Sequence, residues 1–311
     1  MGGTMYGVRR RLRAFCYLAL GFGLWAASGL LTAVASPPGA GDQGSSRATH
    51  ALPRPKHVVI VIEENKSYSD IIGSKHAPYL NALAKQGALF TQSYAVAHPS
   101  EPNYLALFSG STHGLDDDSC PHSFSGANLA SELFNHGKTF GIYSQSLPKV
   151  GFTGCQAGTY WRKHNPAVNW QGANIPRFAN MPFLLFTIVA GDYSHLPAVS
   201  IVVPNAKNDM HDGTIKEGDD WLKHHIAPYV HWAQSHDSLL IVTWDEDDGS
   251  GNNRIPTLFV GPMVKPGRYG RHIDHYDVLR TIEDMFGLKP LGHSAKAKPI
   301  AGVWVQQPAS R

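Results

Sequence analysis

The chain has 311 residues, of which 42% are hydrophobic and 16% are charged. This composition excludes a disordered protein and provides enough apolar material for a core. The 27 basic and 24 acidic residues give a net charge of +3, but residues 1–35 hold four arginines and no acid, so the remainder has 23 bases and 24 acids, a charge of −1. A nearly neutral remainder lacks the basic surface of a nucleic-acid-binding protein, so we expect no nucleic acid as a partner.

The N-terminal segment has the pattern of a secretory signal peptide. Arginines at positions 9–13 precede an apolar, uncharged run over residues 14–31, and Ala33-Val34-Ala35 forms an A-x-A cleavage site. An uncleaved membrane anchor is the alternative, because the run approaches the ~20 residues that a span needs. The cleavage site and the Pro/Gly/Ser-rich residues 36–55 favour cleavage after Ala35. We therefore predict a secreted or periplasmic protein with no stable membrane anchor after cleavage, in which a flexible linker over residues 36–55 precedes one domain over residues 56–311.

Strands and helices alternate along the rest of the chain. Continuous runs of β-branched residues are typical of strands that are buried on both faces of a parallel sheet. We predict strands over residues 57–62, 88–96, 138–144, 198–203, 238–244 and 257–260, and helices over residues 77–87, 101–109, 128–136, 219–235 and 276–286. This order predicts an α/β fold, a three-layer α/β/α sandwich with a mostly parallel central sheet. Residues 145–197 have little periodicity and are predicted to be an insertion over one edge of the sheet.

Signal cleavage leaves two cysteines, Cys120 and Cys155. Two cysteines in an exported chain most often form a disulfide. A metal-binding or nucleophilic role is the alternative, but neither cysteine lies in a C-x-x-C pair. We predict the Cys120–Cys155 disulfide.

Polar clusters follow four of the predicted strands. They are Glu63-Glu64-Asn65, the run from His98 to Asn103, the run from Asn208 to Gly213 that contains His211, and Asp245-Glu246. Each cluster alone is typical of a solvated turn. Ligands of open α/β sheets bind beyond the carboxyl ends of the strands, however, and carboxylates, an amide and histidine suit a divalent cation. Together the clusters predict a metal site.

Ser100 has two interpretations. It precedes a helix with proline near its first turn, so it could be an ordinary N-cap. A hydroxyl at a helix N-terminus also lies where an anion binds, and a nearby metal would make it a nucleophile. The acidic strand ends favour the second interpretation.

Three segments resemble a known family: HVVIVIEENKSYSDIIG, HPSEPNYLALFSG and IVTWDEDDG. They are similar to the bacterial phosphoesterases that include phospholipases C and acid phosphatases, within the alkaline phosphatase superfamily. The resemblance runs from about His57 to Leu288 and implies an alkaline-phosphatase-like fold. It assigns the nucleophile to Ser100 and a contact with the phosphoryl oxygen to Asn103, and it places His211 at the phosphate or the leaving group. The metal ligands that it implies are Glu64, Asn65, Asp245 and Glu246. His98, two residues before Ser100, is a further candidate for substrate binding by its position, with an ordinary surface-loop histidine as the alternative. Because Glu246 stands where two-zinc members carry histidine, the resemblance implies one divalent metal ion.

The resemblance implies a secreted, metal-dependent phosphoester hydrolase. Ser100 would attack a small phosphate ester and form a phosphoserine, and His211 would protonate the leaving oxygen or bind the phosphate. An acid-phosphatase-type phosphomonoesterase is the leading hypothesis, because the chain is short for a phospholipase C and lacks a separate C-terminal lipid-binding module. A phospholipase C-type phosphodiesterase and a non-catalytic binding protein on the same fold are the alternatives.

Overall fold

The computed structural model describes residues 52–188 and 191–305. The predicted signal peptide and most of the predicted linker lie outside these residues. Pro53 and Pro55, at the end of the predicted linker, are buried. The packed domain therefore begins a few residues before the predicted boundary at residue 56. Within the described residues, no helix is long and apolar enough to cross a membrane.

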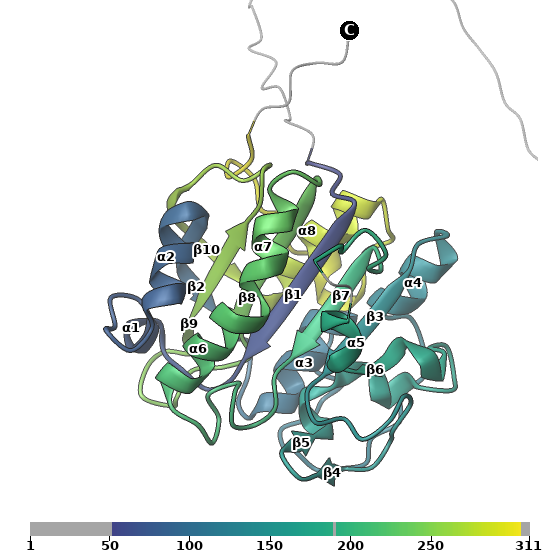
Figure 1. Cartoon of the computed structure of the whole chain (residues 1–311). Helices are drawn as coiled ribbons and strands as arrows, with labels where there is room; N and C mark the ends of the chain where they lie inside the picture. The colour runs from purple at the N-terminus through teal and green to yellow at the C-terminus, as the bar shows by residue number, and fades with distance from the viewer. Residues whose placement is uncertain (1–51, 189–190, 306–311) are drawn as a thin grey trace, which may run out of the picture. The chain divides into compact units, whose positions relative to one another are not determined.

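An eight-stranded sheet forms the centre of the domain (Figure 1). Its strand order is β10-β2-β9-β8-β1-β7-β3-β6. All neighbours are parallel except β9, which runs antiparallel to both β2 and β8. The strands are β1 (His57–Glu63), β2 (Ala88–Tyr94), β3 (Phe140–Ser144), β6 (Asn180–Pro182), β7 (Val199–Val203), β8 (Ser238–Trp244), β9 (Arg254–Val260) and β10 (Gly267–Asp274). The predicted mostly parallel sheet is confirmed.

Helices cover both faces of this sheet, which confirms the three-layer α/β/α architecture. The helices are α1 (Tyr68–Ile71), α2 (Pro78–Gln86), α3 (Ser100–Ser109), α4 (Leu129–Asn135), α5 (Leu184–Thr187), α6 (Ile215–His225), α7 (Ala227–Ala233) and α8 (His275–Phe286). Alternate residues of β1 point to opposite faces. Ile60 packs with α3, α4 and α8, whereas Val61 packs with α2, α6 and α7. Burial of β1 on both sides explains its continuous β-branched sequence.

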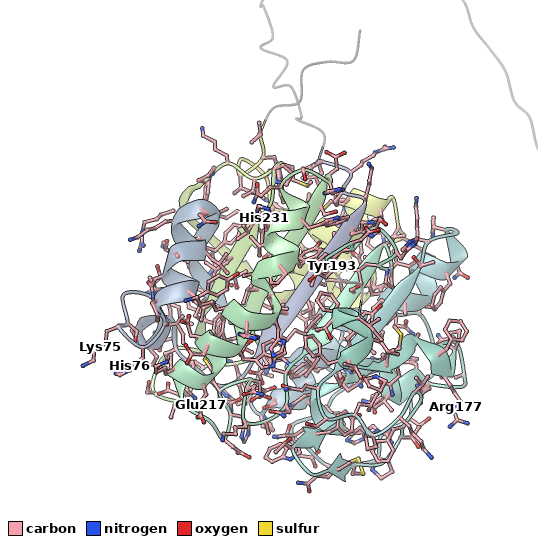
Figure 2. The ribbon with its side chains drawn as sticks, viewed as in Figure 1. Lys75, His76, Arg177, Tyr193, Glu217 and His231 are labelled. Carbon is pink, nitrogen blue, oxygen red and sulfur yellow. A yellow bond between two sulfur atoms is a disulfide. The ribbon has the colours of Figure 1, made fainter. Side chains whose placement is uncertain are left out.

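Helix α7 has one side in the core and one side in solvent (Figure 2). His231 lies on its exposed outer side. Tyr229, on its inner side, is fully buried and packs edge-on against Tyr193, with ring centroids 5.4 Å apart. The buried apolar residues of α7 therefore hold the helix against the sheet. Its exposed polar residues do not belong to the candidate site.

One predicted helix was wrong, and the sheet strands β6 and β10 were not predicted. The single helix predicted over residues 219–235 is two helices, α6 and α7, which meet at Ile226. Pro228 lies in the first turn of α7, a position that needs no backbone N–H. Inside one continuous helix, proline would remove a backbone hydrogen bond, so the helix is interrupted there. Strand β10 was not predicted, because it is an edge strand with alternating exposed residues and two glycines. Such a strand lacks the continuous apolar run that marks a central one.

Residues 145–197 add irregular structure beside β3. They contain the hairpin of β4 (Gln156–Ala157) and β5 (Tyr160–Trp161), the 3₁₀ turns η1 (Arg162–His164), η2 (Pro166–Trp170) and η3 (Arg177–Ala179), and α5. They also supply β6, which extends the central sheet at its edge beyond β3. The predicted Cys120–Cys155 disulfide is present and attaches the start of this hairpin to the segment after α3. One further 3₁₀ turn, η4 (Gly292–Ala295), follows α8.

Candidate functional site

The polar residues after β1, β7 and β8 meet at one end of the sheet. These strands are neighbours and parallel, so their carboxyl ends lie side by side. Main-chain hydrogen bonds continue past the strands and hold the loops together. Glu64 N donates to Asp209 O at 2.7 Å, and Asp245 N donates to Glu63 O at 3.0 Å. The parallel sheet therefore brings together Glu64 and Asp245, which lie 181 positions apart.

Ser100 is buried at this end of the sheet, with 1% of its surface exposed. It is the first residue of α3, and the N-cap is Pro99, so the interpretation of Ser100 as the N-cap is wrong. Its Oγ lies 3.1 Å from both Glu64 Oε2 and Glu246 Oε1. The Ser100 hydroxyl thus faces two of the four predicted metal ligands from the N-terminus of a ten-residue helix.

Asn65 joins the two acidic strand ends. Its backbone has φ of +41°, in the left-handed region that asparagine tolerates better than most residues. In this conformation its backbone N–H donates to Asp245 Oδ1 at 3.2 Å, and its Nδ2 donates to Glu246 Oε1 at 3.1 Å. The structure therefore brings together Glu64, Asn65, Asp245 and Glu246, the four residues predicted to bind the metal, next to Ser100.

The oxygens of this group fit a cation. Asn65 Oδ1 and Asp245 Oδ2 are buried and have no hydrogen-bond partner among the described residues. A buried polar atom without a partner loses solvation free energy, on the order of 1–3 kcal/mol. Two such acceptors beside the carboxylates of Glu64 and Glu246 form an all-oxygen set that suits a hard divalent cation.

The carboxylates repel one another when no cation is present. Burial, and then the charge of Glu246, raises the pKa of Asp245 to about 7. Burial, followed by the charges of Asp245 and Asp209, raises the pKa of Glu64 well above its ordinary value, although a hydrogen bond from Tyr104 opposes this shift. Burial also raises the pKa of Glu246, against the opposing effect of His98. Bound positive charge would remove this penalty.

A pair of histidines lies on the other side of Glu64. Ligand atoms of Glu64, His164 and His211 all lie within 4.8 Å of one another, a geometry that suits a metal ion. His211 Nδ1 is 2.8 Å from Asp212 Oδ1, and its ring lies edge-on to Trp161. The predicted site residue His211 therefore lies beside Glu64.

His164 was not predicted. It is buried, stacks on Tyr104 with ring centroids 5.5 Å apart, and has Nδ1 3.2 Å from Asp209 Oδ2 and Nε2 3.2 Å from Glu64 Oε1. Burial, followed by the nearby charges of Lys163 and His211, holds the pKa of His164 well below its ordinary value. It comes from η1, within residues 145–197, where no strand-end pattern marks it among the 17 histidines of the chain.

Asn103, which the resemblance assigns to the phosphoryl oxygen, binds the loop before Ser100 through its side-chain amide. Its Oδ1 accepts hydrogen bonds from the backbone N–H groups of Val96 and Ala97 at 3.0 Å, and its Nδ2 donates to the carbonyls of Ala97 and Pro99. Both ends of the amide are therefore engaged with the loop that leads to Ser100. In the structure Asn103 holds this loop and makes no contact with the carboxylates around Ser100.

His98 lies at the rim of the site, with about half of its side chain exposed. Its Nδ1 contacts Glu246 Oε2, and its Nε2 is 3.3 Å from Asp247 Oδ1. His275 supports the same strand end from α8, because its Nε2 donates to Asp245 O at 2.7 Å. His98 is thus the accessible histidine of the group, and His275 is a buried support.

Comparisons with known proteins identify the family of the chain. The model of the Phosphoesterase family matches residues 74–289. The chain is 50% identical over 284 residues to a phosphatidylinositol-3-phosphatase of Mycobacterium tuberculosis, an alignment that covers 91% of this chain and 92% of the relative. It is 31% identical over 245 residues to an acid phosphatase of Aspergillus fumigatus, which covers 74% of this chain and 54% of the relative, so the chain spans about half of that fungal protein.

Solved structures share the fold at low sequence identity. An alkaline phosphatase superfamily protein of Vibrio parahaemolyticus has a TM-score of 0.56 at 15% identity and covers 81% of this chain and 72% of its own. A phosphonate monoester hydrolase of Agrobacterium radiobacter has a TM-score of 0.54 at 14% identity and covers 79% and 78%. The fold is therefore that of the alkaline phosphatase superfamily. With a family model that matches more than half of its length, the chain belongs to the phosphoesterase family and is a hydrolase of phosphoric ester bonds.

Proposed function

We propose that this chain is an exported phosphomonoesterase of the acid phosphatase type, which depends on one divalent cation and acts through a phosphoserine at Ser100. One observation carries the proposal: the buried Ser100 hydroxyl lies 3.1 Å from both Glu64 and Glu246, at the N-terminus of α3. The helix amides and the positive end of the helix dipole favour a phosphate there. A serine with a structural role alone would not need two buried carboxylates beside it.

The cation would be held by Glu64, Asn65, Asp245 and Glu246. Asn65 Oδ1 and Asp245 Oδ2 have no hydrogen-bond partner among the described residues, and the carboxylates of Asp245 and Glu246 repel each other. A divalent cation bound there would supply positive charge that lowers the pKa of the Ser100 hydroxyl and offsets charge on the transferring phosphoryl group.

The residues of the chain account for each proton in the proposed reaction. Ser100 Oγ attacks phosphorus, and its proton passes to the Glu64 or Glu246 carboxylate that it faces. The bond from phosphorus to the leaving oxygen breaks, and His211, which lies beside Glu64, protonates that oxygen. Water then attacks the phosphoserine and passes a proton to His211, which the first step left neutral. The bond from phosphorus to Ser100 Oγ breaks, the carboxyl group of Glu64 or Glu246 returns its proton to Oγ, and inorganic phosphate leaves. Buried His164, held by Asp209, would bind a phosphoryl oxygen and position it beside Ser100.

The relatives support the choice of substrate class. The names of the M. tuberculosis and fungal relatives describe phosphatases that act on monoesters, and the first of them names an inositol phospholipid as substrate. We extend monoesterase activity to this chain on that ground. The export proposal, with a signal peptide over residues 1–35 and a linker after it, is supported by the Cys120–Cys155 disulfide, because disulfides persist in oxidising compartments.

The test compares three substrates: 4-nitrophenyl phosphate, bis(4-nitrophenyl) phosphate and phosphatidylcholine vesicles, each with chelator and after the return of Mg²⁺, Mn²⁺, Ca²⁺ or Zn²⁺. We expect hydrolysis of the monoester alone, loss of activity in chelator and recovery with one of the metals. Preferential hydrolysis of the diester or of phosphatidylcholine would instead establish the phospholipase C-type activity. Activity that survives complete removal of metal would refute the metal-dependent mechanism.

A pair of serine variants isolates the nucleophile. Ser100→Ala should lower kcat by at least about 10³-fold, as in other covalent mechanisms. Ser109→Ala is the matched control, because Ser109 is a buried serine at the other end of α3 whose Oγ donates to Leu105 O. Acid quenching during turnover should trap phosphate on the peptide that contains Ser100. An active Ser100→Ala variant would show that water attacks phosphorus directly.

A further inference from the structure

Lys163 is a largely buried lysine that the proposed reaction does not yet use. It lies in η1, directly before His164, and only 16% of its side chain is exposed. Lysine is rarely buried to this extent without a partner. Its Nζ donates to Asp118 Oδ2 at 2.8 Å and lies 4.8 Å from the ring centroid of Trp161. These two contacts hold the ammonium group in one place.

The first contact connects Lys163 to the start of α3. Asp118 Oδ1 accepts a hydrogen bond from Glu101 N at 2.9 Å, and Asp118 Oδ2 accepts the one from Lys163. Glu101 directly follows Ser100, so Glu101 N belongs to the peptide bond of the proposed nucleophile. A single carboxylate therefore joins the ammonium group of Lys163 to the backbone at Ser100.

The second contact connects Lys163 to the two histidines of the site. The Trp161 ring lies edge-on to His211, with ring centroids 4.7 Å apart, and its centroid is 5.6 Å from that of His164. Both histidines have ligand atoms within 4.8 Å of a Glu64 carboxylate oxygen. Lys163 is thus linked through one side chain to the residue after Ser100 and through another to the histidines beside Glu64.

The charge of Lys163 acts on the buried carboxylates of the site. Burial is the main cause that raises the pKa of Glu64 and of Asp209, and the charge of Lys163 opposes the rise in both. Glu64 Oε2 lies 3.1 Å from Ser100 Oγ. The field of the ammonium group therefore reaches the place where a phosphoryl group would meet Ser100.

Lys163 also has donors to offer a ligand. An ammonium group has three N–H donors, and within the described residues Lys163 makes one hydrogen bond, to Asp118. The neighbouring cations differ in this respect. Arg162 donates through three of its nitrogens to a side-chain amide and two carbonyl oxygens, and Lys66 donates to two carbonyl oxygens.

A structural role alone does not account for the ion pair of Lys163 and Asp118. The Cys120–Cys155 disulfide already links the two segments that the pair joins. Arg162 donates to a carbonyl oxygen two residues after Cys120, which links them a second time. A partly exposed ion pair adds little stability to such a connection.

The proposed site needs a further positive charge. A phosphate monoester carries nearly two negative charges at neutral pH. The carboxylates of Glu64, Asp245 and Glu246 together outweigh the charge of one divalent cation. Buried His164 adds no charge, because burial holds its pKa well below the ordinary value. The ammonium group of Lys163 would offset the negative charge of the phosphate.

We propose that Lys163 binds a non-bridging oxygen of the phosphoryl group that is transferred to Ser100, and that Asp118 is the positioning residue that orients Lys163. This inference rests on the proposed phosphomonoesterase function and adds a catalytic residue to it. Lys163 keeps its proton and forms no covalent bond. It stabilises the charge of the phosphate through a charge-assisted hydrogen bond.

The test measures the Kd of inorganic phosphate by calorimetry in the Ser100→Ala background, with the activating metal present. It also measures kcat and KM for 4-nitrophenyl phosphate with Ser100 intact, and Tm for every variant. Lys163→Met removes the charge and keeps an unbranched side chain against Trp161, Lys163→Gln is a second neutral variant, and Lys163→Arg retains the charge. Lys56→Met is the matched control, because Lys56 pairs with Asp237 at 3.7 Å before β1, at the opposite end of the sheet.

Loss of a hydrogen bond between charged groups changes affinity about tenfold or more. We expect each neutral variant to raise the Kd of inorganic phosphate and to lower kcat/KM by at least about this factor. Lys163→Arg should lose less than Lys163→Met, and Lys56→Met should change neither quantity.

Three results would overturn the inference. They are no binding of phosphate with Lys163 intact, an unchanged Kd in both neutral variants, and equal losses in Lys163→Arg and Lys163→Met. An unchanged Kd with a lower Tm would identify a structural ion pair. The proposed function fails separately, if Ser100→Ala still hydrolyses 4-nitrophenyl phosphate, and the Kd of inorganic phosphate would still report on Lys163.

Discussion

Replacement of Asp245 by asparagine should stabilise the metal-free protein and abolish its response to metal. Asp245 is buried beside Glu64 and Glu246, and its pKa rises from 3.8 to about 7, first because of burial and then because of Glu246. Asp245→Asn removes the charge and keeps an oxygen that can accept the hydrogen bond from Asn65 N. The variant therefore separates the cost of the buried charge from the loss of packing.

The size of the effect follows from the pKa. The folded protein holds the Asp245 proton more tightly than the unfolded chain, so stability falls as pH rises from about 4 to about 7. A shift of about three pKa units corresponds to about 4 kcal/mol. In chelator at pH 8, Asp245→Asn should thus be more stable than the wild type by up to about 4 kcal/mol, or about 10 °C in Tm for a domain of this size.

The assay is urea and thermal unfolding at pH 4 and pH 8, in chelator and with the activating metal. At pH 4 the wild type and the variant should have similar stability, because Asp245 is then largely protonated in the folded state. Metal at 100 times its Kd should stabilise the wild type by about 2.7 kcal/mol at pH 8 and the variant by almost nothing. Asp237→Asn, an exposed aspartate, is the control and should change none of these values.

Two results would refute the reasoning. If Asp245→Asn were no more stable than the wild type in chelator at pH 8, the buried carboxylate would carry no electrostatic penalty. If the variant kept full metal content by elemental analysis, Asp245 would not be a ligand.

Two further predictions concern the support of the site. The paired change Cys120→Ser and Cys155→Ser should lower the free energy of unfolding by about 4 kcal/mol, the chain-entropy value for a loop of 35 residues, and thiol titration of the denatured, unreduced wild type should find no free thiol. Asn103→Ala should lower Tm and kcat together, because its amide makes four hydrogen bonds to the loop before Ser100, each worth about 1 kcal/mol; a normal Tm with lost activity would instead make Asn103 a direct substrate contact.

The sequence alone predicted the elements whose environment is uniform along the chain. Strands β1, β7 and β8 are buried on both faces, so every residue meets the same apolar surroundings and the β-branched run marks them directly. Because the continuous apolar runs predict parallel strands, the sequence also predicted that Glu64 and Asp245, which follow β1 and β8, lie at the same end of the sheet. The disulfide followed from the cysteine count after export.

Tertiary structure decided what depends on neighbours distant in sequence. His164 contacts Glu64 because η1 lies at the carboxyl end of the sheet, and no pattern in the local sequence predicts that position of η1. Strand β10 pairs with β2 at an edge of the sheet, and three of its eight residues are exposed, so its sequence lacks a continuous apolar run. The Ser100 hydroxyl does not cap α3. It lies within hydrogen-bond distance of Glu64 and Glu246 because the loops that follow β1, β2 and β8 meet at one end of the sheet. Hydrophobic periodicity reports which side of an element is buried, whereas the convergence of polar side chains depends on strand order and on where each connection crosses the sheet.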